Sequence, residues 1–240
     1  MAGFDLRIVE AGGERLPCVV RGAGAPRRLL IIPPLFEEMN RSRRLMALAG
    51  AALGERGIET VLPDLPGTGD HAPGGPDAMD WARWRGAVHA LAQAMAPHAT
   101  LALRGGALLD DAAGEQPRYR LAPVAGAALL RDLLRARAAS DAEAGGGGAG
   151  TTVAGLDAQL AAGAAVEAAG YRLSPDLAEA LRAARPAPAR AGDRTAALAG
   201  ADGSQCILPG RAPWRTAEPV AVAPLAWALA ADVEAWLCAR

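Results

Sequence analysis

The chain has 240 residues, a formal net charge of -1 and 21% charged side chains. This is the composition of one soluble globular domain, or of a domain with a small insertion. The near-neutral balance excludes nucleic-acid binding by bulk positive charge. All 25 basic residues are arginine, which we attribute to composition bias rather than to guanidinium chemistry. We therefore expect a single domain over residues 1–240.

The cysteines and the two ends of the chain indicate in which cellular compartment the protein is located and whether it holds a metal. Cys18, Cys206 and Cys238 are far apart and odd in number, so neither a disulfide framework nor a zinc site is indicated. We expect no metal and no cofactor. The first residues lack the apolar run of a signal peptide, and two acidic residues interrupt the apolar stretch 220–237, which therefore predicts no membrane span. A cytoplasmic location is expected.

The first 110 residues predict alternating strands and helices. A turn signal separates two β-prone runs at the start, and a continuous apolar run ended by two prolines is typical of a strand buried on both faces. The predicted strands are 5–9, 16–20, 29–32, 60–62 and 100–103, and the predicted helices are 45–53 and 81–95. This order indicates crossover units that build an open α/β sheet.

The second half alternates less clearly. We expect strands at 118–124, 166–173 and 220–222, and helices at 129–134, 175–184 and 225–237. Ser174 is well placed as the N-cap of the second of these helices, with Pro175 at its first position. Glycines 145–148 predict a flexible connection without packed structure of its own, and 186–201 is a second loose segment.

One segment is specific enough to indicate a family. The run from Ile32 to Arg44, IPPLFEEMNRSRR, resembles the corresponding motif of the exosortase A system-associated hydrolase 2 family, which belongs to the α/β-hydrolase superfamily. Six further blocks resemble that family in order: 64–70, 103–109, 122–124, 133–137, 169–175 and 213–218. The resemblance is weakest over 138–165 and 186–205.

The resemblance implies an α/β-hydrolase-like fold, with a mostly parallel central sheet and helices on both faces. It also implies a reduced cap segment at approximately 138–185, with a flexible glycine-rich stretch at 145–150. The family occurs in bacteria that export proteins bearing a C-terminal sorting signal, PEP-CTERM, and that make exopolysaccharide. These properties are expectations that the resemblance brings to this chain.

The predicted strand 100–103 ends where this fold carries its nucleophile. Active members have serine in the motif G-x-S-x-G on a sharp strand-to-helix turn. This chain reads Ala102-Leu-Arg-Gly-Gly106, so Arg104 occupies the nucleophile position. A guanidinium has no lone pair available for attack. The sequence therefore predicts an elbow without a nucleophile.

The catalytic base is missing as well. The triad of this fold places histidine after the last strand, but the only histidines are His71, His89 and His98, all before the elbow. Cys206 is a poor replacement nucleophile because no histidine follows it. These absences argue against Ser-His-Asp hydrolysis, which needs a base within hydrogen-bond reach.

Two interpretations of Arg104 remain open. In the first, Arg104 and the N-terminus of a helix starting at Gly105 bind a carboxylate, phosphate or sugar acid. In the second, Arg104 pairs permanently with Glu37 or Glu38 of the facing loop. In both cases we expect Arg104 to point into the same crevice as one of these glutamates. The candidate ligand-binding residues are Arg104, Glu37, Glu38, Asn40, Arg43 and Asp64.

Other polar residues are expected to have structural roles. Asn40 or Ser42 is a candidate helix N-cap. Asp64 and Asp70 flank a glycine-rich loop and are expected to stabilise a turn, although Asp64 also follows a strand at the edge where α/β sheets bind ligands. His71 is expected to be solvated.

Two functions from different classes follow. The first is a non-hydrolytic protein that binds a small anionic ligand or a protein partner in an exosortase and exopolysaccharide context. The alternative is an active hydrolase of an ester, thioester or glycan-linked acyl group, with Glu37 or Glu38 as acid or base. Fold alone does not decide between them.

Overall fold

The computed structural model describes residues 3–71, 79–145, 148–199, 204–216 and 220–240. Its main sheet has eight strands in the order β1-β2-β4-β3-β5-β6-β9-β10. Their bounds are β1 Phe4–Ala11, β2 Glu14–Arg21, β3 Arg27–Ile32, β4 Ile58–Pro63, β5 Ala99–Leu103, β6 Arg118–Leu121, β9 Arg194–Leu198 and β10 Cys206–Leu208. β2 runs antiparallel to both β1 and β4, and the other neighbours are parallel.

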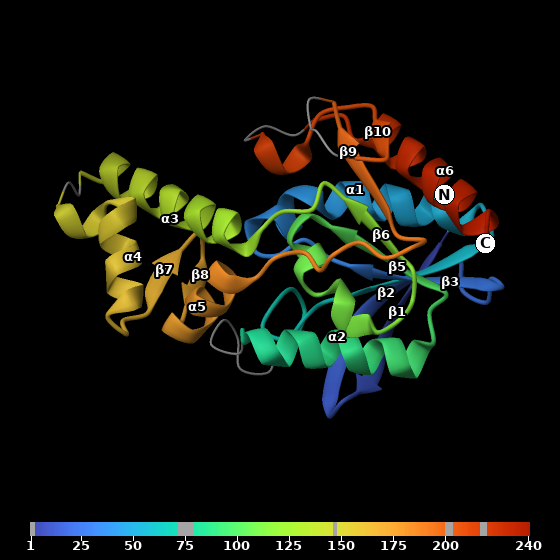
Figure 1. Ribbon diagram of the computed structural model, residues 1–240, viewed down its shortest axis with the longest axis horizontal. Helices are drawn as coiled ribbons and strands as arrows, with labels where there is room; N and C mark the ends of the chain where they lie inside the picture. The colour runs from blue at the N-terminus through green and yellow to red at the C-terminus, as the bar shows by residue number, and fades with distance from the viewer. Residues whose placement is uncertain (1–2, 72–78, 146–147, 200–203, 217–219) are drawn as a thin grey trace.

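Helices cover both faces of this sheet (Figure 1). α1 (Glu37–Gly54) and α6 (Ala223–Cys238) pack together on one face, and α2 (Trp81–Met95) lies on the other. β3 shows how the sequence produces this layering: Leu29 and Ile31 pack with α1 and α6, whereas Leu30 and Ile32 pack with α2. The predicted α/β-hydrolase-like fold, with its mostly parallel sheet, is therefore confirmed.

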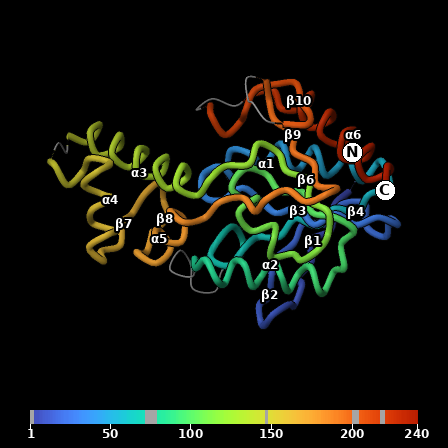
Figure 2. Tube along the Cα trace, in the orientation of Figure 1, coloured from blue at the N-terminus to red at the C-terminus, as the bar shows by residue number. Residues whose placement is uncertain are grey.

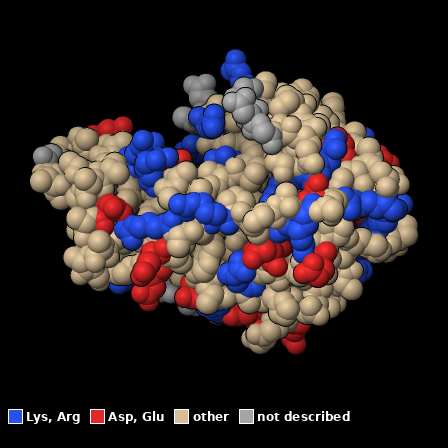
Figure 3. All heavy atoms as spheres, in the orientation of Figure 1, with Lys and Arg blue, Asp and Glu red and all other residues tan. Residues whose placement is uncertain are grey.

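Residues 126–145 and 148–183 form a lobe at one end of the molecule, which we call the cap lobe (Figures 1 and 2). It contains α3 (Gly126–Glu143), the 3-10 helix η4 (Ala149–Thr151), α4 (Val153–Ala161), the hairpin β7 (Val166–Ala168) and β8 (Tyr171–Leu173), and α5 (Pro175–Ala183). α5 begins as predicted, because the Ser174 hydroxyl accepts the Leu177 N–H at 3.1 Å. On the face shown in Figure 3, arginine and acidic side chains interleave across both parts of the molecule.

Parts of the second half differ from the prediction. The single strand expected at 166–173 is a hairpin, because Ala169 (φ 50°) and Gly170 (φ 81°) form a two-residue turn with positive φ. A helix that the sequence did not predict, α4, follows the glycine run and buries Leu156 and Leu160. Residues 146–147 of that run lie outside the described part.

Two further strand predictions were wrong. β9 lies inside the segment predicted to be loose, and its alanine-rich sequence is held as a strand by parallel pairing with β6 and β10. Conversely, residues 220–222 form no strand, since Val222 is already the N-cap residue of α6. In both cases tertiary context overrides the local β-propensity.

α1 begins earlier than the sequence indicated. Neither Asn40 nor Ser42 is its N-cap: both lie inside the helix, which starts at Glu37 after Phe36 (φ 57°) and has no side-chain cap. Glu37 and Glu38 are therefore not loop residues. They occupy the first turn of α1, where the positive end of the helix dipole favours acidic side chains.

Candidate functional site

The turn after β5 has the geometry of a nucleophile elbow. β5 ends at Leu103, and the 3-10 helix η2 (Arg104–Leu108) follows without a spacer. Arg104 has φ 51°, a left-handed conformation that is uncommon for a residue other than glycine. A Cβ at Gly106 would lie 2.6 Å from the Pro33 carbonyl oxygen. The structure thus places an arginine at a tight, strained strand-to-helix turn.

The helix expected after the elbow differs from the prediction. η2 has five residues and is followed by a second 3-10 helix, η3 (Asp110–Ala113), instead of a regular α-helix from Gly105. Aligned peptide dipoles add up to a large helix dipole only along a helix of several turns, whereas 3-10 helices are short. The expectation that a helix N-terminus reinforces an anion site at Arg104 is therefore wrong.

Arg104 is paired within the protein. Its Nε and Nη2 donate to Glu38 Oε1 at 3.0 and 2.8 Å, and its Nη1 donates to the Ala122 carbonyl at 3.1 Å. The guanidinium carbon lies 5.2 Å from the ring centroid of Trp214. Only 10% of the Arg104 side chain and 15% of the Glu38 side chain are exposed. The elbow thus carries a buried ion pair, with α1 supplying the carboxylate.

Glu38 is held in an environment that disfavours its charge. Burial raises the pKa of the Glu38 carboxyl above its ordinary value, Arg104 partly offsets this rise, and Asp132 adds to it. The second oxygen, Oε2, is buried and has no hydrogen-bond partner among the described residues. One oxygen of this carboxyl is therefore committed to Arg104, and the other is unsatisfied.

A crevice of about 420 Å³ lies beside this pair. The cap lobe contributes Leu129 and Leu133 of α3, and the sheet domain contributes Phe36 and Trp214, the latter from the 3-10 helix η5 (Pro213–Arg215). The walls are thus largely apolar and come from both parts of the molecule.

Carboxylates supply much of the polar lining of this crevice. Glu37, Glu38 and Asp132 all border it, together with the single guanidinium of Arg41. Glu37 pairs with Arg41 at 3.3 Å, one turn along α1. The crevice therefore combines an apolar wall with several hydrogen-bond acceptors.

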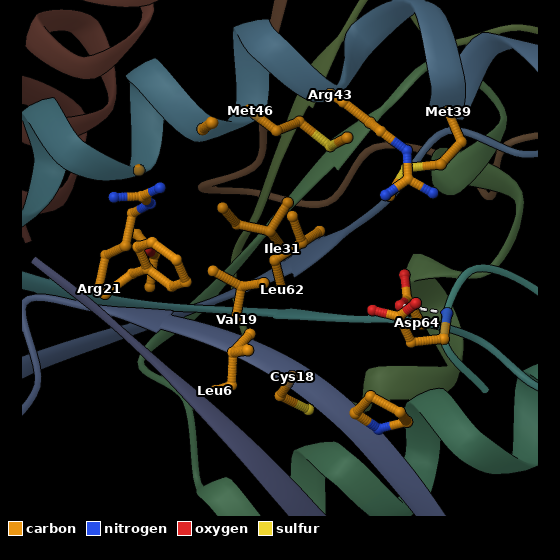
Figure 4. Close-up of a pocket in the computed structure, with 16 residues that line it drawn as sticks. Leu6, Cys18, Val19, Arg21, Ile31, Met39, Arg43, Met46, Leu62 and Asp64 are labelled. Carbon is orange, nitrogen blue, oxygen red and sulfur yellow. Dashed lines mark hydrogen bonds between the residues drawn. The ribbon is translucent and has the colours of Figure 1, made fainter.

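Of the predicted site residues, Glu37 and Glu38 line this crevice. Arg104 is paired with Glu38 but is not among the lining residues, and the other three lie elsewhere. Asn40 donates to Glu37 at 3.2 Å and accepts from Arg43 Nε at 3.4 Å. Arg43 and Asp64 line a second groove of about 250 Å³ between α1 and strands β1, β2 and β4, where they point toward one another from opposite sides (Figure 4). The structure thus brings Arg104 together with Glu38 and places Glu37 beside them, but it separates the other candidates.

Asp64 has the turn-stabilising role that the sequence predicts. Its Oδ2 accepts the Asp70 N–H at 2.8 Å, which closes the loop after β4. Burial raises the pKa of the Asp64 carboxyl, and the hydrogen bond from Asp70 and the nearby Arg43 charge partly offset the rise.

None of the three histidines can serve the elbow. His71 is buried, not solvated as predicted, because the loop after β4 folds it against β2. The observed partners are Glu14 for His71 (3.3 Å), the Ala112 carbonyl for His89 (3.2 Å) and the Arg28 N–H for His98 (3.1 Å). Each ring is therefore occupied away from Arg104.

The thiols do not replace the missing nucleophile. Burial raises the pKa of Cys18 to about 12. Burial and the neighbouring Asp232 also raise the pKa of Cys206. A thiol is nucleophilic as the thiolate, so neither group is activated. No set of three or more His, Cys, Asp or Glu side chains within the described ranges is arranged to hold a metal ion.

Three contributors to the site were missed from the sequence. Ala122 accepts a hydrogen bond from Arg104 through its backbone carbonyl, which a pattern of side chains cannot predict. Asp132 lies inside the helix predicted at 129–134, but the sequence does not show which face of that helix borders the crevice. Trp214 lies in one of the seven blocks that resemble the hydrolase family, which was the available signal.

The comparisons with known proteins give structural similarity alone. No protein-family model matches the chain, and no curated protein matches it significantly. Solved epoxide hydrolases are similar in structure: one from Vigna radiata (23% identity, TM-score 0.39), epoxide hydrolase A from Mycobacterium thermoresistibile (23%, 0.40) and a mutant from Solanum tuberosum (26%, 0.39). The matches cover 49%, 50% and 50% of this chain and 40%, 39% and 40% of those chains.

A substitution at Gly106 tests the tight turn. Gly106→Ala is expected to lower the free energy of unfolding by about 1–3 kcal/mol, because the added methyl meets backbone carbonyls that cannot rotate away. The control is Gly86→Ala in the middle of α2, where the added Cβ meets nothing; it is expected to stabilise by up to about 1 kcal/mol. Denaturant unfolding measures both. Equal stability of Gly106→Ala and the native chain would contradict the tight elbow.

Removal of Arg104 is expected to create a pH-dependent instability. In Arg104→Met, Glu38 stays buried without its cation, so its folded-state pKa rises further above the unfolded value of about 4.3. A raised carboxyl pKa gives stability that is present below the unfolded pKa and is lost as pH rises through the folded pKa. The variant should therefore lose about 3–5 kcal/mol near neutral pH and much less near pH 4.

The double variant Arg104→Met/Glu38→Gln is the control for that prediction. It removes the titrating carboxyl, so most of the pH dependence that Arg104→Met introduces should disappear. Unfolding free energies measured between about pH 4 and pH 8 give the comparison. A pH-independent loss in Arg104→Met would contradict the assignment of Glu38 as the buried partner.

Proposed function

We propose that this protein is a non-hydrolytic member of the α/β-hydrolase fold that binds a ligand in the crevice between the Arg104–Glu38 pair and the cap lobe. One observation carries the proposal: the nucleophile position holds a cation that is already paired. Acyl transfer by this fold needs a nucleophile and an imidazole base at that point. The crevice retains a volume suited to a small ligand.

The proposed ligand is anionic: a carboxylate, a phosphate or a sugar acid. Such a group can reach Arg104 only by replacing Glu38 on the guanidinium. The raised pKa of the Glu38 carboxyl supports this exchange, because protonation of Glu38 releases Arg104 without leaving an unpaired buried charge. Anion binding would then be coupled to proton uptake. A protein partner that inserts an acidic side chain would use the same chemistry.

The cellular context of the proposal comes from the sequence resemblance. The run from Ile32 to Arg44 supplies both Phe36 at the crevice and Glu38 at the elbow, so the most family-like block is also the one that builds the site. We assign the protein on this basis to an exosortase and exopolysaccharide setting. The three free thiols fit a cytoplasmic location. No described helix is long and apolar enough to cross a membrane.

A second candidate function is favoured by the state of Glu38. A buried carboxyl with a raised pKa, one unsatisfied oxygen and a position beside a crevice has the properties of a general acid or base. In this alternative the protein hydrolyses an ester, thioester or glycan-linked acyl group, and Glu38 moves the proton. The ion pair with Arg104 weighs against it, because it commits one oxygen of the carboxyl.

Activity and binding assays separate the two candidates. The binding proposal predicts no turnover of p-nitrophenyl esters and thioesters above buffer, and no covalent labelling by a fluorophosphonate. It also predicts a higher unfolding temperature with acetate, inorganic phosphate or glucuronate. Arg104→Met should lose that shift, whereas Arg190→Met, which removes an arginine outside the crevice, should keep it. Saturable turnover that Glu38→Gln abolishes would establish the hydrolase instead.

A further inference from the structure

We propose that strand β1 is the surface at which two copies of this chain pair, antiparallel and about a two-fold axis at Leu6. This inference concerns a part of the molecule away from the crevice and does not rest on the proposed function. It would join two eight-stranded sheets edge to edge. Three properties of β1 support this pairing: its exposure, the direction of its free backbone groups and the order of its side chains.

β1 is the terminal strand of the sheet and pairs with β2 alone. The first five residues of β1 are exposed on both faces of the sheet. Every second one is a large apolar residue: Phe4, Leu6 and Ile8 are 56, 74 and 52% exposed. Proteins normally protect an edge strand of this kind with charge, proline or a covering element, because unpaired strands recruit other chains. In β1 the Arg21 guanidinium lies 5.1 Å from the ring centroid of Phe4, but Leu6 and Ile8 keep more than half of their surface exposed.

The backbone of β1 offers its hydrogen-bonding groups to a partner at the same three residues. Pro17 lies opposite Ile8, has no N–H, and turns its carbonyl toward β4, where it accepts the Asp64 N–H at 2.8 Å. Ile8 is therefore not hydrogen-bonded to β2. By the alternation of an antiparallel ladder, Phe4 and Leu6 are not hydrogen-bonded to it either. The N–H and C=O groups of all three residues point to the open edge.

The order of side chains is self-complementary. When Leu6 lies opposite Leu6 of a second copy, Phe4 lies opposite Ile8, and Asp5 lies opposite Arg7. Every cross-strand pair is then apolar with apolar or acid with base, and both kinds stabilise a sheet. The three residues with free backbone groups form the hydrogen-bonded pairs in this register. A two-fold axis makes each contact occur twice.

The nearest competing registers are poorly matched. Moving the axis by one residue, to Arg7 or to Asp5, keeps the backbone groups aligned, but it places Arg7 opposite Arg7 or Asp5 opposite Asp5. Like charges directly opposite one another destabilise a sheet. The side chains therefore select the register centred on Leu6, just as the hydrophobic pattern sets register inside a sheet.

Asp5 and Arg7 already form an exposed ion pair of 2.9 Å within one chain. In the dimer, two such pairs would meet as a cluster of four alternating charges on one face of the joined sheet. On the other face, Phe4 and Leu6 also border the groove of Figure 4, so the two grooves would lie on either side of a shared apolar seam. Charge and apolar matching thus favour a second copy over an unrelated partner.

The dimer is expected to be weak. Five residues a side is far fewer than the roughly 20–30 of a standard interface, so association should depend on concentration. Sedimentation velocity from about 1 µM upward, the range of Kd that corresponds to modest binding energies, should show a monomer that converts to a dimer. A chain that stays monomeric up to about 1 mM would overturn the proposal.

Charge reversal tests the pairing of Asp5 with Arg7. Asp5→Arg and Arg7→Asp each place like charges opposite one another twice in the dimer, and each should weaken association about tenfold. The combined variant restores opposite charges and should restore the affinity. Glu115→Arg is a matched control, because Glu115 is exposed and distant in sequence from β1. A dimer that is indifferent to Asp5→Arg would show that another surface is used.

Cysteine cross-linking tests the register in a Cys238→Ser background, which removes the exposed native thiol. Leu6→Cys should form a disulfide-linked dimer under mild oxidation, since paired strand residues lie within disulfide range. Ile8→Cys alone should not, because its two copies would be about 13 Å apart. A mixture of Phe4→Cys and Ile8→Cys chains should cross-link. Cross-linking of Ile8→Cys but not of Leu6→Cys would overturn the proposed register.

Discussion

The ion pair between Arg104 and Glu38 connects the end of central strand β5 with the first turn of α1. A buried guanidinium must be paired, because an isolated charge in a low-dielectric interior costs several kcal/mol. Once arginine occupies the elbow, a carboxylate must therefore reach it. The early start of α1 supplies one: beginning the helix at Glu37 directs the next side chain to the elbow. The same start of α1 places Glu37 and Glu38 at the border of the crevice.

At the same pair, the backbone geometry resembles a nucleophile turn but the side chains do not. The elbow has the positive φ of Arg104, and Gly106 lies close to the backbone carbonyls of Ile32 and Pro33. Both are backbone properties of a nucleophile turn. The crevice and the cap lobe lie beside this turn. The turn carries neither a serine nor an imidazole, and each histidine has a different structural partner. The described residues therefore do not place at this turn the groups that Ser-His-Asp hydrolysis needs.

The sequence could predict features that depend on local pattern. The continuous apolar run of β3, the Ser174 cap and the arginine at the elbow all followed from neighbouring residues. It could not choose between Glu37 and Glu38, because adjacent helix residues point about 100° apart and the choice depends on where α1 begins. β9 and the buried position of His71 were missed for a similar reason. Both are set by distant contacts, through the pairing of β9 with β6 and β10 and through the approach of Glu14 to the loop after β4.

Nuclear magnetic resonance of the Arg104 side chain measures the ion pair with Glu38 in solution. A guanidinium that donates through both Nε and Nη2 to a buried carboxylate should give an Nε–H signal that exchanges slowly with water, and Glu38→Gln should speed that exchange markedly. The signal is assigned by its absence in Arg104→Met. An Arg104 Nε–H that exchanges as fast as that of the exposed Arg15, whose side chain is 74% accessible, would contradict the account.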